Sequence, residues 1–309
     1  MILISSSTFD ISTNYVIDWL LYFDNNCGEK IIRINDDKDY EISFDGKTIY
    51  ILKDDVYINL DTIKSYWYRR GRIRFKVNQN GFFKNLKEEE EKVLEEYIHH
   101  KLRKIKSIND FFNSEPNKII VLEEAQKVGL LVPESFICQN KRSVNNILID
   151  DLVTKTILGS SMINFNDKIS LIYTKTVNKN KVLNNFLPSL FQQKVDKKYE
   201  LRILYFENKF WSMAIFSQLD SKTIIDSKNY NYEKPTRKVP FQLPKKIENK
   251  LKKLLLNLKY NCCSIDMIVT LKNEFVFLEI NPIGQFGMIS IPCNYKIEKI
   301  IANFLMNEN

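Results

Sequence analysis

The sequence predicts an α/β protein built from two or three packed units. Its 309 residues exceed what one small core needs. Several segments carry apolar residues at helical spacing, namely 14–23, 87–112, 118–128, 245–260 and 295–305. Short apolar segments between them, such as 2–5, 31–34 and 264–271, have the length and composition of buried strands. Helices and strands are therefore mixed along the whole chain.

The first third of the chain combines strands with one long helix. Asp45-Gly46 separates two strand-like segments, 40–44 and 48–52, and this dipeptide is a strong hairpin signal. The helix expected over 87–112 starts with acidic residues and continues with basic ones, an order that suits the helix dipole. Its acidic run is expected to be a solvated first turn, and His99 and His100 are assigned no chemistry. Asn113-Ser-Glu-Pro116 breaks the pattern and marks a candidate domain boundary.

Composition narrows the class of protein. Hydrophobic residues make up 44% of the chain and charged residues 27%, values ordinary for a globular protein. No apolar run reaches the roughly 18 residues of a membrane span, and the opening Met-Ile-Leu-Ile is too short for a signal peptide. We therefore expect a cytoplasmic protein with no membrane partner. The net charge of +8 favours an anionic partner, but the basic residues are dispersed, which argues against dedicated nucleic-acid binding.

The cysteines do not indicate a disulfide framework or a zinc site. The chain has five, an odd number, and none forms a C-x-x-C pair. We expect them to be reduced thiols, with Cys262 and Cys263 packed in a strand.

The most informative segment is 264–282. Two strands pairing around Asn273 would place Asp266 nearly opposite Glu279, and alternation would put Glu279 and Asn281 on one face. Three oxygen donors would then converge at the end of a hairpin, and such hard ligands suit magnesium. The same pattern also fits a buried Asp and Glu that only hydrogen-bond backbone groups.

Asp266, followed after a hydrophobic strand by Glu279-Ile-Asn281-Pro282, resembles the metal-binding signature of the ATP-grasp superfamily. The resemblance implies that Asp266, Glu279 and Asn281 hold Mg2+ ions that bridge the phosphates of ATP. It also implies an α/β ATP-grasp fold with three domains. These are an N-terminal pre-ATP-grasp domain over 1–113, a central subdomain over 114–191 and a C-terminal subdomain over 192–309, with the nucleotide between the last two.

Other segments keep the order of ATP-grasp motifs. Lys118 and Lys155 resemble the two ATP-contacting lysines, and Glu200-Leu-Arg202 resembles the acidic-x-Arg motif. By resemblance Glu200 meets the ribose or the lysine network, and Arg202 orients the acyl phosphate or the substrate carboxylate. The segment 190–195 resembles the hinge whose backbone reads adenine, through Gln193, Lys194 and Val195.

Three further segments narrow the resemblance to graspetide synthetases, the microviridin-type peptide ligases, and within them to the maturases of grasp-with-spasm systems. They are 9–20, Trp67-Tyr-Arg-Arg-Gly71, and Asn281-Pro-Ile-Gly-Gln-Phe-Gly287 with its continuation to Tyr295. Arg69, Arg70 and Arg72 could bind acidic side chains of a peptide, because guanidinium groups grip carboxylates in a bidentate way. They equally fit a structural patch. Lys228 stands where the subgroup has an arginine, which keeps a charge for phosphate contact but loses the bidentate fork.

The resemblance implies an ATP-dependent peptide macrocyclase. Its partner would be a ribosomally synthesised precursor peptide with a leader and a core rich in acidic and hydroxyl side chains, and a homodimer is expected. Each core carboxylate would become an acyl phosphate, which a Ser or Thr hydroxyl or a Lys amine then attacks. Lys155, Arg202 and Lys228 would act on the transferring group. Two alternatives stay open: a RimK-like ligase that adds an amino acid to a protein, and a non-catalytic peptide-binding protein of the same fold.

Overall fold

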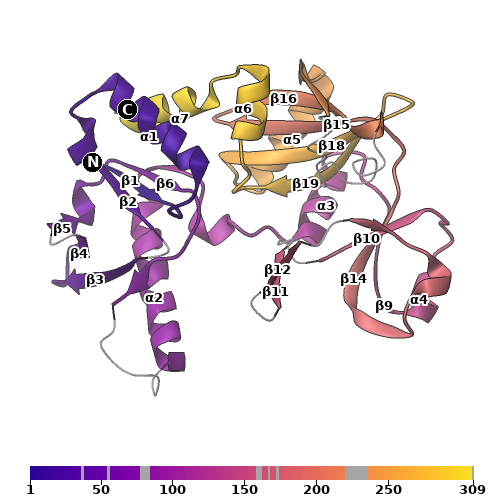
Figure 1. The fold of residues 1–309 in the computed structure, drawn as a ribbon, viewed down its shortest axis with the longest axis horizontal. Coiled ribbons are helices and arrows are strands. Elements are labelled where there is room, and N and C mark those ends of the chain that lie inside the picture. Colours follow the sequence, from indigo (N-terminus) through magenta and orange to yellow (C-terminus); the bar gives the residue numbers. More distant parts are fainter. Residues whose placement is uncertain are drawn as a thin grey trace. The chain divides into compact units, whose positions relative to one another are not determined.

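The computed structural model describes residues 1–35, 38–53, 56–76, 84–157, 162–165, 168–171, 174–219 and 236–307. The chain forms two compact units, Met1–Ser114 together with Gln285–Asn309, and Glu115–Gly284. Figure 1 labels many of the elements of both. This division does not test the three domains predicted from the sequence, which stay a prediction. No helix of the described part is both long and apolar enough to cross a membrane.

A parallel four-stranded sheet forms the centre of the first unit, in the order β2-β1-β6-β8. Its strands are β1 (Ile2–Ser5), β2 (Ile31–Ile34), β6 (Ser65–Tyr68) and β8 (Lys106–Ile108). Every residue of β1 and β6 is buried, as expected for parallel strands covered on both faces. The predicted N-terminal helix is found as α1 (Ile11–Phe23), and Asp10 caps it by accepting from the Ser12 amide.

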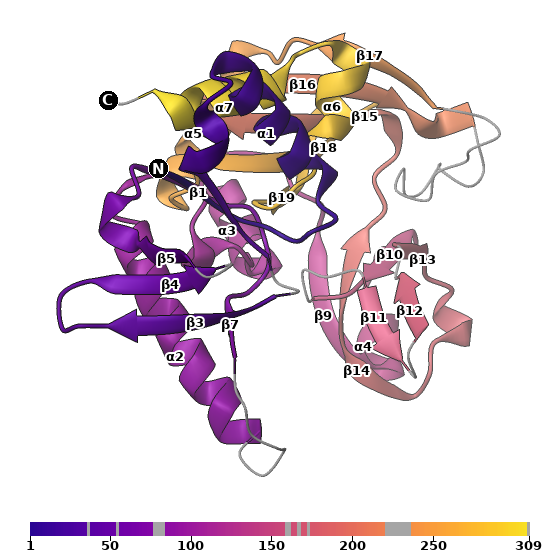
Figure 2. The ribbon, with the colours of Figure 1, turned by 60° about the vertical axis from the view of Figure 1, so that its left-hand side comes forward.

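A second sheet of this unit has the order β5-β4-β3-β7. It contains β3 (Asp39–Phe44), β4 (Ile49–Lys53), β5 (Val56–Asn59) and β7 (Arg74–Phe75). The predicted hairpin is confirmed: β3 and β4 pair antiparallel, and Gly46 takes the left-handed conformation with φ 90°. Figure 2 shows this sheet beside the long helix α2 (Lys84–Leu102).

The helix predicted over 87–112 is too long at its C-terminal end. The helix ends at Leu102, and Lys106–Ile108 leave it to form β8, which pairs in parallel with β6. The apolar residues Ile105 and Ile108 fit the helical stripe equally well, so local periodicity could not separate the two outcomes. The open edge of β6 offers a pairing partner for residues 106–108, so tertiary pairing determines that they form a strand.

The C-terminal segment completes the first unit. It forms α6 (Gly287–Cys293) and α7 (Ile297–Met306), and α7 packs on α1 (Figure 1). Ser65 Oγ donates to the Leu305 carbonyl at 2.7 Å, and the Lys299 ammonium lies 5.1 Å above the Trp19 ring. The ends of the chain therefore share one core.

The second unit begins with α3 (Lys118–Lys127), which ends before Gly129 at φ 80°, as predicted. A sheet in the order β13-β10-β14-β9 follows, with the short helix α4 (Lys141–Asn145). Its strands are β9 (Ser135–Asn140), β10 (Leu152–Lys155), β13 (Lys175–Thr176) and β14 (Asn185–Gln193). The strands β11 (Met162–Phe165) and β12 (Lys168–Leu171) form a two-stranded antiparallel sheet of their own.

An antiparallel sheet in the order β17-β16-β15-β18-β19 carries most of the predicted site. Its strands are β15 (Lys197–Phe206), β16 (Lys209–Phe216), β17 (Arg237–Phe241), β18 (Cys262–Thr270) and β19 (Phe275–Asn281). One face packs on α5 (Lys245–Asn257) and α3 through a shared apolar core, including Ile203, Ile265, Met267, Leu251, Leu254 and Val121. The alternate residues of β15 and β18 project from the opposite face of the sheet.

Short 3-10 helices connect these elements, at Cys27–Lys30, Leu60–Thr62, Phe111–Asn113, Lys179–Lys181 and Ser217–Leu219. All five cysteines are buried thiols, and Cys262 and Cys263 lie in β18, as predicted.

Candidate active site

The hairpin of β18 and β19 places the predicted metal ligands together. Asp266 pairs with Glu279, and Ser264 pairs with Asn281, so these four side chains share one face of the sheet. The sequence predicts the pairing of Asp266 with Glu279. A register shift directly after Asp266 interrupts the ladder, and such bulges re-aim side chains at sites.

Arg202 lies beside Asp266 on the neighbouring strand β15. Its Nη1 donates to both carboxylate oxygens of Asp266, at 2.5 and 2.6 Å. Burial lowers the pKa of the Arg202 guanidinium, but the charge of Asp266 and its hydrogen bond outweigh burial, so this pKa is raised. Arg202 Nε is buried without a hydrogen-bond partner among the described residues. The guanidinium therefore keeps one donor for an incoming anion.

The two predicted lysines converge on Glu279. Lys118 Nζ lies 3.7 Å and Lys155 Nζ 3.9 Å from Glu279 Oε2, and each of the three side chains is about one-sixth exposed. Lys118 is the first residue of α3, held there by the Asn117 cap, and Lys155 is the last residue of β10. Residues far apart in the sequence thus bring two ammonium groups to the carboxylate opposite Asp266.

Glu200 lies on β15 two residues before Arg202, on the same side of the strand. Its Oε1 accepts from Ser217 Oγ at 2.9 Å and from the Lys197 ammonium. Lys197 is 8% exposed, and no feature of the sequence identifies it as a site residue. Only its burial distinguishes it from the many surface lysines, and burial is not visible in the sequence.

The predicted hinge includes the last residues of β14 and the two residues after it. The Gln193 amide donates to the Glu134 carbonyl and the Lys194 amide to the Asp151 carbonyl, at 2.9 and 2.8 Å. These bonds fix the backbone that leads to Val195. Reading of adenine by Gln193, Lys194 and Val195 stays a prediction. Lys228 lies outside the described residues.

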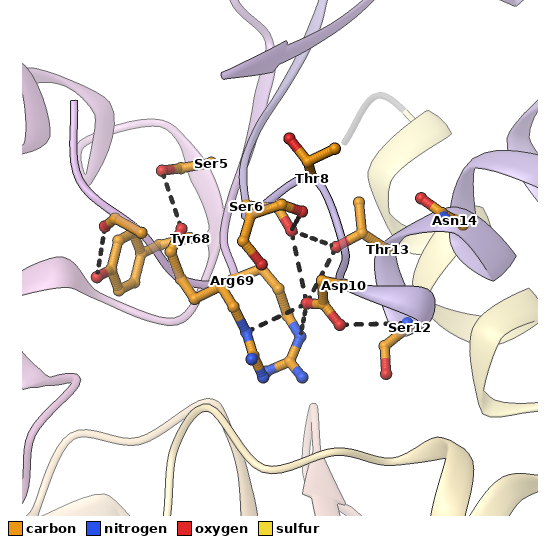
Figure 3. A network of polar contacts seen from close by, with 12 residues as sticks. Ser5, Ser6, Thr8, Asp10, Ser12, Thr13, Asn14, Tyr68 and Arg69 are labelled. Atoms are coloured by element: carbon orange, nitrogen blue, oxygen red, sulfur yellow. Dashed lines mark hydrogen bonds and ion pairs between the residues drawn. The ribbon is translucent and has the colours of Figure 1, made fainter. Parts of the chain in front are cut away.

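The three predicted substrate arginines belong to the first unit, and each meets a carboxylate of that unit. Arg69 is 1% exposed, and its Nε lies 2.8 Å from Asp10 Oδ2. Arg70 Nε lies 3.4 Å from the same oxygen, and Arg72 Nε 3.0 Å from Glu95 Oε2. Figure 3 shows Asp10 between Arg69, Thr13 and the Ser12 amide. For Arg69 this geometry favours the structural alternative, and peptide binding by the group stays a prediction.

The donors of this site fit a magnesium ion. Two carboxylates and one amide side chain occupy adjacent cross-strand positions, and Mg2+ prefers few protein oxygens completed by phosphate and water. The described residues contain no cluster of three or more His, Cys, Asp or Glu side chains, so a zinc-type cage is not present among them. Asp266, Glu279 and Asn281 as ligands stay a prediction that these positions support.

Solved structures identify the fold. The structure is similar, over 98% of this chain and 94% of the other, to an RiPP-associated ATP-grasp ligase from Chryseobacterium gregarium in complex with ADP and a leader and core peptide, at 25% identity and TM-score 0.82. The chain has the ATP-grasp fold. The structure is also similar to the macrocyclase MdnC from Microcystis aeruginosa MRC, bound with the precursor peptide MdnA, at 24% identity, 99% coverage of both chains and TM-score 0.78.

A third ATP-grasp structure is more distant in sequence. The ligase PsnB, complexed with a minimal precursor variant, Mg and ADP, is 13% identical over 99% of this chain and 97% of that chain, with TM-score 0.74. No family model matches the sequence, and no curated protein matches it. The predicted α/β ATP-grasp fold is confirmed.

Proposed function

We propose that this ATP-grasp enzyme is an ATP-dependent peptide macrocyclase. It activates Asp or Glu side-chain carboxylates of a ribosomal precursor peptide and joins them to Ser or Thr hydroxyls, or to Lys amines. One observation carries the proposal: Arg202, Asp266, Glu279, Lys118 and Lys155 form one charged cluster, in a fold that matches a peptide-bound RiPP ligase over nearly its full length.

The charges of the cluster suit a nucleotide with a divalent cation. Three cationic side chains face two carboxylates, at distances of 2.5 to 3.9 Å. Phosphate oxygens can replace Glu279 as the partners of Lys118 and Lys155. Asp266, Glu279 and Asn281 can then hold Mg2+. The cation would neutralise charge on the phosphates. The ion pairs of the free protein thus hold these side chains close to the positions that they need when ligands bind and they change partners. This limits the free-energy cost of assembling the site.

The reaction needs no protein nucleophile. A carboxylate oxygen of the peptide attacks the γ-phosphorus of ATP, the bond to the β,γ-bridging oxygen breaks, and ADP leaves. Lys118 and Lys155 hold the transferring phosphoryl group, and Arg202 orients the resulting acyl phosphate. A peptide hydroxyl then attacks the acyl carbon, phosphate leaves with the bonding electrons, and the hydroxyl proton is lost. The product is a ring ester lighter than the precursor by one water.

Other roles complete this proposal. Glu200, oriented by Lys197 and Ser217, meets the ribose, and the backbone of 193–195 meets adenine. Arg70 and Arg72, which are partly exposed, are better suited to peptide carboxylates than the buried Arg69. Lys228 is assigned to phosphate contact. A cytoplasmic homodimer is part of the proposal by family resemblance.

The test is mass spectrometry of a candidate precursor peptide, with a leader and a core rich in acidic and hydroxyl side chains, after incubation with the enzyme, ATP and Mg2+. We expect loss of one water per ring, and no loss with Glu279→Gln. Glu274→Gln is the matched control, because Glu274 is exposed in the turn of the same hairpin. A mass gain equal to an amino acid would instead assign a RimK-like ligase, and binding without any mass change would contradict the enzymatic proposal.

A further inference from the structure

Ser264 carries a buried hydroxyl next to the predicted metal ligands of the candidate site. It is 1% exposed, and its Oγ has no hydrogen-bond partner in the part of the chain that the structure describes. A buried hydroxyl without a partner costs free energy, because it has lost its hydrogen bonds to water. Native structures contain few such groups, and each requires an explanation.

The Ser264 side chain lies on the face of the sheet that carries the candidate site, opposite the apolar core. Ser264 lies two residues before Asp266 on β18, so both project from the same face. Its cross-strand partner is Asn281, a predicted metal ligand. The core face of the strand is taken by Cys263 and Ile265, which pack against the apolar cluster.

Gly284 fixes the Ser264 side chain in this position. A Cβ placed on Gly284 would lie 2.5 Å from Ser264 Cβ and closer still to Oγ, so only glycine allows the approach. Gly284 closes a turn by donating to the Asn281 carbonyl at 3.1 Å. The serine side chain is therefore packed between β18 and the turn that follows Asn281 at the end of β19.

We propose that Ser264 is a further binding residue of this site. Its hydroxyl donates to an oxygen that arrives with the ligands, either a water of the divalent cation or a phosphate oxygen of the nucleotide. The inference rests on the proposed function, since it presupposes that this face binds a nucleotide with a cation. The unpaired donor of the free protein then becomes a paired donor in the loaded one.

The test compares Ser264→Ala with Ser212→Ala. Ser212 is a buried serine of the same sheet, but its Oγ donates to the Phe241 carbonyl at 2.7 Å. Without ligands, Ser212→Ala should lower Tm by roughly 2–8 °C, whereas Ser264→Ala should leave Tm unchanged or raise it. With ligands the order reverses: Ser264→Ala should weaken Mn2+ binding in the presence of ADP roughly two- to tenfold, and Ser212→Ala should not.

Mn2+ binding is read from the electron paramagnetic resonance signal of the free ion, and ADP binding without metal from calorimetry. A loss confined to the first assay assigns the contact to cation-bound water, and an equal loss in both assigns it to phosphate. Wild-type affinity in both assays for Ser264→Ala overturns the inference alone. A wild-type protein that binds no Mn2+ with ADP overturns the proposed function as well. If Ser264→Ala fails to fold, Ser264→Gly removes the same hydroxyl and fits beneath Gly284.

Discussion

His99 lies buried in the first unit, on the inner side of α2. Its Nδ1 is 2.8 Å from the Tyr66 hydroxyl, its ring stacks on Phe111 at 4.1 Å, and its Nε2 is 3.9 Å from Glu95. Burial lowers the pKa of His99 more than the neighbouring Glu95 and Asp110 raise it. The ring is therefore neutral in the folded protein at neutral pH.

This lowered pKa predicts a loss of stability in mild acid. Below about pH 6.5 the unfolded chain binds a proton at this residue while the folded chain does not, so acid favours unfolding. The free energy of unfolding should fall, by at most about 1.4 kcal/mol per pH unit, until the folded pKa is reached. Urea unfolding at pH 5 to 8 measures it. His99→Gln should flatten the dependence and the exposed His100→Gln should retain it; the reverse would contradict the assignment.

Single residues differ in how far the sequence could predict them. The positions of Asp266, Glu279 and Asn281 follow from strand alternation, and the register confirms that pairing. Lys197, Ser264 and the buried Glu95 could not be predicted, because their significance depends on burial, which is not visible in the sequence. A serine in a strand and a lysine in a lysine-rich chain carry no local signal.

At the scale of elements, Asp10 joins α1 to the end of β6. Its carboxylate caps the helix and faces Arg69 (Figure 3), and Arg70 lies beside the same carboxylate; both arginines directly follow β6. Asp10 and Arg69 are both almost completely buried. Removing one charge of such a pair leaves the other uncompensated, which is the costly case.

We therefore expect Asp10→Ala to destabilise the first unit by about 3–5 kcal/mol. Arg74→Ala is the control, because Arg74 and Asp39 form an ion pair in which both side chains are about half exposed. Its loss should cost less than about 1 kcal/mol. Denaturant unfolding measures both. Similar small effects for the two variants would show that the Asp10 network does not hold these elements together.

Elements were predictable where local pattern and tertiary packing agree. The Asp45-Gly46 hairpin and α3 before Gly129 combine a period with a turn or cap, and α5 carries a strong amphipathic pattern. The helix prediction was wrong for 103–108, because the same apolar spacing fits a helix and a short strand. β6 supplies the pairing partner that makes it a strand. α6 lies in a segment containing Pro292, for which the sequence reasoning predicted no helix.

At the scale of the molecule, the C-terminal segment is a structural part of the first unit. Four apolar residues of α7 are buried, namely Ile297, Ile301, Ala302 and Leu305. A chain ending at Gly284 should therefore lose hydrogen-exchange protection in β1, β6 and α1 while β15, β18 and α5 keep theirs. A chain ending at Asn307 retains α7 and should behave as wild type. Full protection of β1 in the shorter chain would contradict this expectation.

The ATP-grasp fold could be predicted for the whole chain because its motifs follow a fixed order, from Lys118 to Asn281. The two-unit division could not, since it depends on Gln285–Asn309 returning to pack on α1. Nothing in the composition of that segment distinguishes a return from a continuation.

This return has a consequence for synthesis on the ribosome. Residues 1–114 are translated first, yet the last elements of their core emerge only after residues 115–284 have been made. At about 5–20 residues per second, that interval is on the order of 10–30 s. The contiguous second unit can fold during this time, whereas the nascent first unit waits with β1 and β6 lacking α7. The early segment is thus the part of the chain that chaperones would be expected to engage during translation.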